Sequence, residues 1–243
     1  MKEQHKKKSI TDYRAVVFDL DGTLYYQRKL RRTMVGRLLH YYAGHPWRIK
    51  ELLAVKEFRS VREHWDSIGE TVPTVSKEDK TGFLDHAQYA YVAAKMKIPA
   101  VQVECAVQKW IHESPLSALK KSRDEEIGHL MEMLRARGIQ VLIFSDYPVK
   151  EKLEALEFQA DGMYSASDDR LMELKPSPKG LLLIMQDYRL EPGELLMIGD
   201  RYSRDALAAV NAGADYLILG KTQKKRRPVY EELWKEIKGT ERI

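Results

Sequence analysis

Five short runs of apolar residues constrain the fold of this chain more than any other feature. They are rich in Val, Ile and Leu and alternate little between apolar and polar positions, as strands covered on both faces do. Their ranges are 15–20, 141–146, 163–167, 195–200 and 216–220. Helical patterns separate the later runs, so that strand and helix alternate from residue 141 to residue 220. This order predicts an α/β protein with a doubly wound parallel sheet.

The helical patterns between these runs have recognisable ends. We expect Ser177 to cap a helix that has Pro178 at its first position. Ser203 is expected to cap a second helix, which stops at Gly213. Gly138 is expected to end the helix that precedes the second strand.

Residues 25–114 interrupt this alternation and contain no strand-like run. Apolar residues there recur near helical spacing, so we expect a helical module inserted after the first strand. The predicted boundaries are 1–24 and 115–243 for a Rossmann-like core and 25–114 for the insert. The insert carries 15 Lys/Arg and 10 Asp/Glu, which accounts for the whole net charge of +5. This distribution suggests that the two parts of the chain have separate roles, with a metal bound by one part and an anionic substrate by the other.

The composition argues against several classes of protein. Of the 243 residues 44% are hydrophobic and 32% charged, which is typical of a soluble globular protein. No apolar run approaches the roughly 18 residues needed to cross a bilayer, and the basic N-terminal segment lacks the apolar stretch of a secretory signal. The single cysteine, Cys105, cannot form an internal disulfide, so a cytoplasmic location is expected. The basic runs 6–8 and 224–227 accompany no nucleic-acid-binding motif, and a nucleic-acid partner is not expected.

Acidic residues lie at the ends of the first and fourth runs. Asp19 and Asp21 stand two positions apart in FDLDGTL, where alternation along a strand puts them roughly on one side. Asp200 ends the fourth run, and Asp205 lies in the first turn of the following helix. If the first and fourth strands are neighbours, Asp19, Asp21 and Asp200 converge at the carboxyl edge of the sheet, where ligands bind in such folds. Ligands that offer only oxygen suit Mg²⁺, which also binds phosphate.

A carboxylate that attacks a phosphate needs help, because both groups are anionic. Lys175, in KPSP, is placed to supply a fixed positive charge in addition to the metal. Ser145, at the end of VLIFS, can donate its hydroxyl to a phosphate oxygen. Positioned charges and donors of this kind are the main source of catalysis in phosphoryl transfer.

The segments FDLDGTL and GDRYSRD, with Ser145 and Lys175 between them, resemble the four ordered motifs of the haloacid dehalogenase-like hydrolases. These motifs span residues 18–205, most of the chain. The resemblance implies that Asp19 attacks phosphorus and forms an aspartyl-phosphate. It also implies that Asp21 protonates the leaving oxygen and then activates the hydrolytic water.

The same resemblance implies how the metal and the phosphoryl group are held. Asp19, the backbone carbonyl of Asp21 and Asp200 would bind Mg²⁺, while Asp205 would orient or join the metal ligands. The other two motif residues, Ser145 and Lys175, would hold the phosphoryl group. The helical insert resembles the cap of the subgroup that includes phosphoglycolate phosphatases and β-phosphoglucomutases.

Two positions depart from the family's pattern. Tyr25 and Tyr26 follow DGTL, where many relatives carry an acidic and a small residue. The entry to the insert is therefore aromatic, and the identity of the substrate is not safely inferred from that of close relatives. Asp146 follows the motif serine, where many relatives have Asn, so the polar contact beside Ser145 differs.

These observations predict a phosphomonoester hydrolase acting on a small phosphorylated metabolite. A phosphomutase with the same aspartyl-phosphate is the first alternative, since only the acceptor of the phosphoryl group differs. A non-catalytic binding protein on this fold is the second, and the intact acidic residues with Lys175 argue against it. Haloacid dehalogenation is not expected, because Asp21 is an acid/base that carbon–halogen displacement does not need. The sequence fixes neither the substrate nor the oligomeric state.

A basic cluster follows the DGTL turn where the chain enters the insert. Its members are Arg28, Lys29, Arg31 and Arg32. The cluster is either a solvated helix end or, at the mouth of the site, a binding site for a second anionic group of the substrate.

Overall fold

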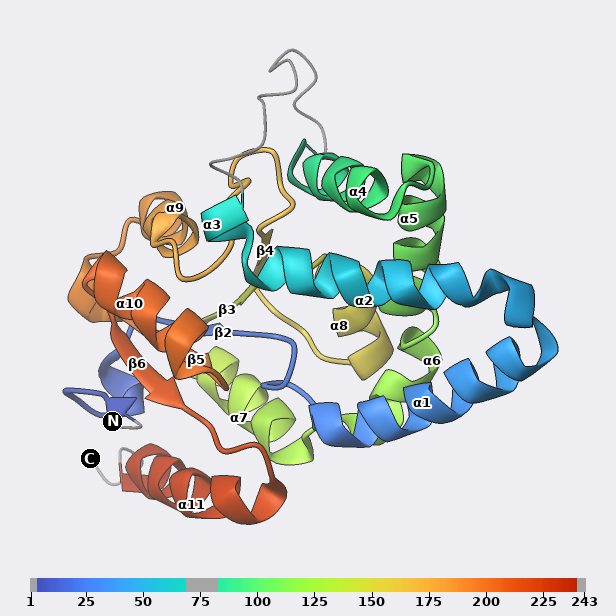
Figure 1. The fold of residues 1–243 in the computed structure, drawn as a ribbon. Coiled ribbons are helices and arrows are strands. Elements are labelled where there is room, and N and C mark those ends of the chain that lie inside the picture. The colour runs from blue at the N-terminus through green and yellow to red at the C-terminus, as the bar shows by residue number, and fades with distance from the viewer. Residues whose placement is uncertain (1–3, 69–82, 240–243) are drawn as a thin grey trace.

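The computed structural model describes residues 4–68 and 83–239 (Figure 1). Six strands within them form one sheet in the order β1-β6-β5-β2-β3-β4. The strands are β1 (Gln4–His5), β2 (Ala15–Phe18), β3 (Gln140–Ser145), β4 (Gly162–Ser165), β5 (Leu195–Gly199) and β6 (Asp215–Ile218). β2 to β6 are parallel, and β1 pairs antiparallel with β6. The predicted doubly wound α/β fold is confirmed, and the first and fourth expected strands, β2 and β5, are neighbours.

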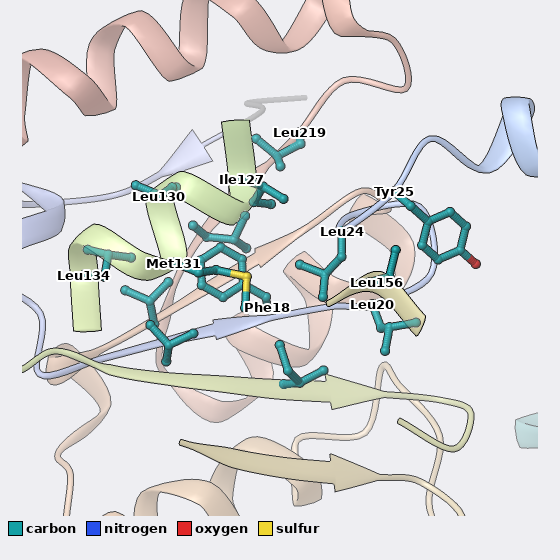
Figure 2. Packing of buried hydrophobic residues seen from close by; sticks show 14 of the residues in the cluster. Phe18, Leu20, Leu24, Tyr25, Ile127, Leu130, Met131, Leu134, Leu156 and Leu219 are labelled. Carbon is teal, nitrogen blue, oxygen red and sulfur yellow. The ribbon is translucent and has the colours of Figure 1, made fainter. Parts of the chain in front are cut away.

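Helices cover both faces of this sheet, and each face has its own apolar core. On one face lie α7 (Glu125–Ala136), α8 (Lys150–Leu156) and α11 (Gln223–Gly239), which pack on Val16, Phe18 and Ile143 (Figure 2). On the other face lie α9 (Lys179–Tyr188) and α10 (Leu207–Ala212), which pack on Ala15 and Val17. Successive residues of β2 point to opposite faces, so both faces of this strand are buried. The lack of alternation in its sequence follows from this burial.

All the secondary-structure elements that the structure describes between residues 27 and 113 are helical. Their elements are α1 (Gln27–Gly44), η2 (Pro46–Arg48), α2 (Ile49–Glu63), α3 (Trp65–Ile68), α4 (Phe83–Met96), α5 (Ala100–Val107) and the π-helical turn η4 (Gln108–Glu113). α2, α4 and α5 pack around a third apolar core that includes Phe58, Val92 and Val103. This packing agrees with a helical insert, whose boundaries at residues 25 and 114 remain a prediction. Residues 69–82 of the predicted insert lie outside the described residues.

Short helical turns complete the described chain. They are η1 (Ile10–Asp12), α6 (Leu116–Leu119), η5 (Lys120–Ser122), η6 (Pro192–Glu194) and η7 (Tyr202–Ala206). None of the described helices combines the length and the apolar character needed to cross a membrane.

The predicted helix ends are partly correct. α7 and α10 end just before Gly138 and Gly213, and both glycines adopt a φ of 75°, which favours glycine. The predicted start of the helix after Ser177 is wrong by one residue. α9 begins at Lys179, with Pro178 as its N-cap, and the Ser177 hydroxyl accepts the Lys179 N–H at 3.3 Å.

The predicted cap at Ser203 is also wrong. This residue lies inside the π-helical turn η7, which begins one residue earlier. The Asp205 carboxylate accepts the backbone N–H groups of Asp200 and Arg201, at 3.1 and 2.9 Å. Asp205, inside the turn, therefore holds the backbone that leads from β5 into it, and no side chain of the described residues caps the turn itself.

Candidate active site

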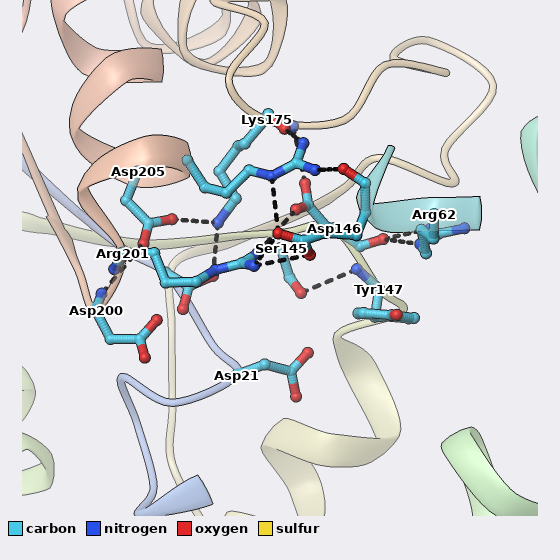
Figure 3. A network of polar contacts seen from close by, with 12 residues as sticks. Asp21, Arg62, Ser145, Asp146, Tyr147, Lys175, Asp200, Arg201 and Asp205 are labelled. Atoms are coloured by element: carbon cyan, nitrogen blue, oxygen red, sulfur yellow. Dashed lines mark hydrogen bonds and ion pairs between the residues drawn. The ribbon is translucent and has the colours of Figure 1, made fainter. Parts of the chain in front are cut away.

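The predicted site residues lie at the carboxyl edge of the sheet. Asp19 follows β2, Ser145 ends β3, and Asp200 follows β5 (Figure 3). The Asp19 N–H donates to the Ile198 carbonyl at 2.8 Å, so the pairing of β2 with β5 continues into the site. The position of three strand ends side by side therefore brings together residues that are far apart in the sequence.

Three carboxylates gather at this edge. Asp19, Asp200 and Asp205 each offer an oxygen, and these oxygens lie within 4.8 Å of one another. Asp19 and Asp205 are 6% and 1% exposed. Within the described chain, Asp200 Oδ1 is buried and has no hydrogen-bond partner. A buried carboxylate oxygen without a donor is costly, and a cation would compensate it.

The turn after Asp19 approaches this acidic group closely. Gly22 adopts a φ of 103°, and a Cβ at this position would lie 2.6 Å from Asp200 Oδ2. Only glycine combines this backbone conformation with so close an approach. The glycine of DGTL thus brings the turn against the carboxylate at the end of β5.

The electrostatics of the acidic group also favour a cation. Burial raises the pKa of Asp19, and Asp205 and Asp200 add to the rise against the opposing charge of Lys175. Burial and the charge of Asp205 likewise raise the pKa of Asp200. Crowded, buried carboxylates resist ionisation unless positive charge is added. An all-oxygen donor set of this kind fits Mg²⁺ or a similar hard cation.

Lys175 provides a positive charge fixed inside the site. Its Nζ lies 2.6 Å from Asp19 Oδ1 and 2.7 Å from Asp205 Oδ1, and the residue is 1% exposed. Burial would lower the pKa of Lys175, but Asp19, Asp205 and Asp146 outweigh it and raise the pKa. The Asp146 carboxylate accepts the Lys175 N–H at 2.9 Å, and Arg204 donates to the Lys175 carbonyl. Asp146 stands where many relatives have Asn, and its carboxylate anchors the segment that carries Lys175.

Ser145 is buried at the end of β3. Its Oγ accepts the Tyr147 N–H at 3.1 Å. The hydroxyl proton can therefore be donated to a ligand oxygen.

Asp21 has different partners from the other acidic residues. Lys152 Nζ lies 2.7 and 2.8 Å from its two carboxylate oxygens, and the Tyr25 hydroxyl donates to Oδ1. Figure 3 shows the Asp21 carboxylate directed away from Asp200. Burial alone would raise the pKa of Asp21, but Lys152 and Tyr25 outweigh it and lower the pKa. The expected convergence of Asp21 with Asp19 and Asp200 thus does not extend to its side chain.

Several residues around the site were not predicted. Lys152 is charged but buried on α8, a helix too short to show a clear polar face. On α2 of the insert, Arg62 donates to the Asp146 carbonyl and lies 4.6 Å from the centre of the Tyr147 ring. The adjacent Glu63 pairs with both of its carboxylate oxygens to Arg201, each at 2.9 Å. The end of α2 therefore contacts the carboxyl edge of the sheet, and Asp66 on α3 adds an ion pair with Arg204 at 3.5 Å.

The basic cluster at residues 28–32 lies elsewhere. All four side chains are exposed on α1, and none of them contacts a predicted site residue in the described part of the chain. Arg59, one turn before Arg62 on α2, is close enough to Tyr25 and Tyr147 for its charge to act on both. Burial and Asp21 raise the pKa of Tyr25, and the charge of Arg59 opposes this rise. Arg59 forms no ion pair within the described residues.

A parallel sheet with helices on both faces and reactive groups at its carboxyl edge defines an α/β enzyme. Residues 13–213 match the family model of the haloacid dehalogenase-like hydrolases. The chain therefore belongs to this family. It is also 29% identical over 105 residues to a probable phosphoglycolate phosphatase from Pseudomonas putida, and the match covers 42% of this chain and 41% of that protein.

Solved structures share the fold over almost the whole chain. A 2-haloacid dehalogenase from Pseudomonas syringae is 14% identical, with a TM-score of 0.56 over 91% of this chain and 99% of that one. CbbY from Rhodobacter sphaeroides, in complex with xylulose-1,5-bisphosphate, is 16% identical, with a TM-score of 0.51 over 87% and 89%. At identities this low, the structural similarity shows the common fold alone. The activity has to be inferred from the residues of the site.

Proposed function

We propose that this hydrolase is a magnesium-dependent phosphatase that acts on small phosphorylated metabolites through an aspartyl-phosphate on Asp19. The observation that carries the proposal is the contact of Lys175 with both Asp19 and Asp205 beside the unpartnered Asp200 oxygen. A carboxylate nucleophile there has a fixed cation on one side and a metal site on the other. The relative from Pseudomonas putida and the bisphosphate complex of CbbY agree with a phosphorylated substrate.

In the first step, Asp19 attacks phosphorus and the bond from phosphorus to the ester oxygen breaks. Asp21, once it has left Lys152 and taken up a proton from solvent, gives this proton to the leaving oxygen. In the second step, Asp21 takes a proton from water, and this water attacks the phosphorus of the aspartyl-phosphate. Inorganic phosphate leaves, and the Asp19 carboxylate is restored.

The remaining residues hold the reacting groups. Ser145 and Lys175 bind oxygens of the phosphoryl group. Asp19, Asp200 and the Asp21 carbonyl would hold Mg²⁺, whose charge reduces the repulsion between nucleophile and phosphate. Asp205 orients Lys175 and the backbone of the Asp200–Arg201 segment.

Asp21 also bears on the choice between reactions. Dehalogenases are among the proteins with this fold, but displacement of a halide requires no proton donor at the leaving group. A carboxylate at residue 21 favours an alkoxide leaving group, which needs a proton.

The insert at residues 25–114 would act as the cap that selects the substrate. The single cysteine suits a cytoplasmic protein.

The test is phosphate release from a panel of phosphorylated metabolites, with Mg²⁺ and with EDTA. We expect Mg²⁺-dependent release from at least one substrate and none from the Asp19→Asn variant. A parallel assay measures halide release from 2-haloacids, and product analysis detects transfer of phosphate to a sugar. Halide release without phosphate release would refute the proposal, and a phosphorylated sugar in place of free phosphate would make the protein a mutase.

A further inference from the structure

Arg226, near the start of α11, is buried beneath the turn that follows Asp19. The residue is 0% exposed, and its guanidinium donates to several backbone carbonyls. Nη2 donates to the Gly22 carbonyl, Nη1 to the Thr23 carbonyl at 2.7 Å, and Nε to the Gly220 carbonyl at 2.7 Å. Nη1 also lies 2.7 Å from the Asp124 carboxylate, which neutralises the charge. The last helix of the chain thus contacts the catalytic turn about two hundred residues earlier.

All but one of the backbone carbonyls of residues 20–24, which form this turn, accept a hydrogen bond from a described residue. The Leu20 carbonyl accepts two N–H groups of the turn itself, and the Leu24 carbonyl accepts the Asp124 N–H at 3.0 Å. Arg226 donates to the Gly22 and Thr23 carbonyls between them. The Asp21 carbonyl is the one in this turn that accepts no hydrogen bond from a described residue. The apolar side chains of Leu20 and Leu24 both pack into the core on the face of α7, α8 and α11 (Figure 2).

The geometry of arginine suits this arrangement. A guanidinium has five N–H donors in a rigid plane, and Arg226 directs them at three carbonyls and one carboxylate. The Tyr230 hydroxyl donates to the same Asp124 oxygen at 2.7 Å, and the Tyr26 ring centre lies 4.9 Å from the guanidinium carbon. A lysine could keep the charge but could not direct four bonds in these directions.

We propose that Arg226 is a positioning residue for the metal site. By holding the Gly22 and Thr23 carbonyls, it fixes the turn in the shape that leaves the Asp21 carbonyl available as a metal ligand. This inference rests on the proposed function, in which that carbonyl binds Mg²⁺. Residues that orient metal ligands typically change metal affinity by about 10- to 100-fold when they are replaced.

The test compares Arg226→Lys and Arg226→Gln with Arg227→Gln. Arg227 is exposed on the same helix and, among the described residues, pairs with Glu231. For each protein, Mg²⁺ binding to the metal-free chain is measured by calorimetry, alongside Tm, kcat and KM. We expect Mg²⁺ affinity to fall about 10- to 100-fold in the folded Arg226 variants, with kcat reduced more than KM is raised. Arg227→Gln should match the parent.

A folded Arg226 variant with parental Mg²⁺ affinity and kcat would overturn the proposal. If both Arg226 variants fail to fold, Tyr230→Phe carries the test, because it loosens Asp124 without changing Arg226 or the turn. Weaker Mg²⁺ binding by folded Tyr230→Phe supports the proposal, and parental binding overturns it. A parent that binds Mg²⁺ but hydrolyses no phosphate ester would refute the proposed function alone.

Discussion

Lys152 holds both carboxylate oxygens of Asp21, at 2.7 and 2.8 Å. The lysine is 6% exposed, and Tyr25 donates to the same carboxylate. Asp21 is therefore ionised and held apart from the acidic group of the metal site. To protonate a leaving oxygen it must leave Lys152 and take up a proton from solvent, so this lysine controls the residue that moves the proton.

The Lys152→Met variant tests this control. Removing the lysine removes the main influence that lowers the pKa of Asp21, so burial should raise that pKa. Because Asp21 must be protonated in the first step, we expect the basic limb of the profile of kcat/KM against pH to move up by about 1 to 3 pH units. Tyr25→Phe removes a single neutral donor and should move the limb less. A basic limb at the same pH in Lys152→Met would show that Asp21 does not set it.

The raised pKa values of Asp19 and Asp200 predict how Mg²⁺ stabilises the fold. Between the ordinary carboxyl pKa and these raised values, the folded metal-free protein binds more protons than the unfolded chain. The stability that these groups contribute is therefore present at low pH and is lost as the pH rises through the raised pKa values. Bound Mg²⁺ removes this loss, because it replaces the protons.

We therefore expect the increase in Tm on adding Mg²⁺ to grow from about pH 5 to about pH 8. Calorimetric scans of the same protein with Mg²⁺ and with EDTA measure it. Asp200→Asn, which removes a charged ligand but keeps the shape, should show a smaller increase that varies less with pH. An increase in Tm that is equal at all pH values would contradict the carboxylate site.

The fold and the central site could be predicted because their signals are local. Asp19 and Asp200 stand at the ends of apolar runs, and parallel strands place such ends along one edge. Asp21 shows the limit of this reasoning, since alternation places a residue but does not reveal its partner. Lys152 lies 131 positions away on α8, and only the packing of that helix against the sheet brings it to the turn that carries Asp21.

Other features lacked any local signal. β1 is too short and polar to read as a strand, and it forms by pairing antiparallel with β6. Arg226 belongs to a basic run that predicts a solvated face, yet its side chain is fully buried. A run of charged residues predicts exposed side chains. The burial of Arg226 depends on carbonyls that are distant in the sequence, so the run itself does not indicate it.

Arg59 and the basic cluster on α1 can be compared as binding sites for a second anion on the substrate. Arg59 lies one turn before Arg62 and Glu63, which contact the core, and has no ion-pair partner in the described chain. We expect Arg59→Ala to raise KM about 10-fold for a substrate that bears a carboxylate or second phosphate, as for a lost charged contact. The ratio of its kcat/KM to that of para-nitrophenyl phosphate should fall accordingly.

Arg28→Ala is the matched control, because Arg28 is exposed on α1. It should leave this ratio as in the parent. The reverse result, a changed ratio in Arg28→Ala alone, would return the anion site to the basic cluster at residues 28–32.

The central claim is that Asp19 carries the phosphoryl group, and rapid quenching with acid followed by peptide mass spectrometry tests it most directly. In a reaction of the Mg²⁺-loaded parent with its best substrate, we predict that the peptide containing Asp19 gains the mass of one phosphoryl group. The gain should disappear on treatment with hydroxylamine, which cleaves acyl phosphates, and should be absent from Asp19→Asn. Phosphate release by the parent with no labelled Asp19, or full turnover by Asp19→Asn, would contradict the account.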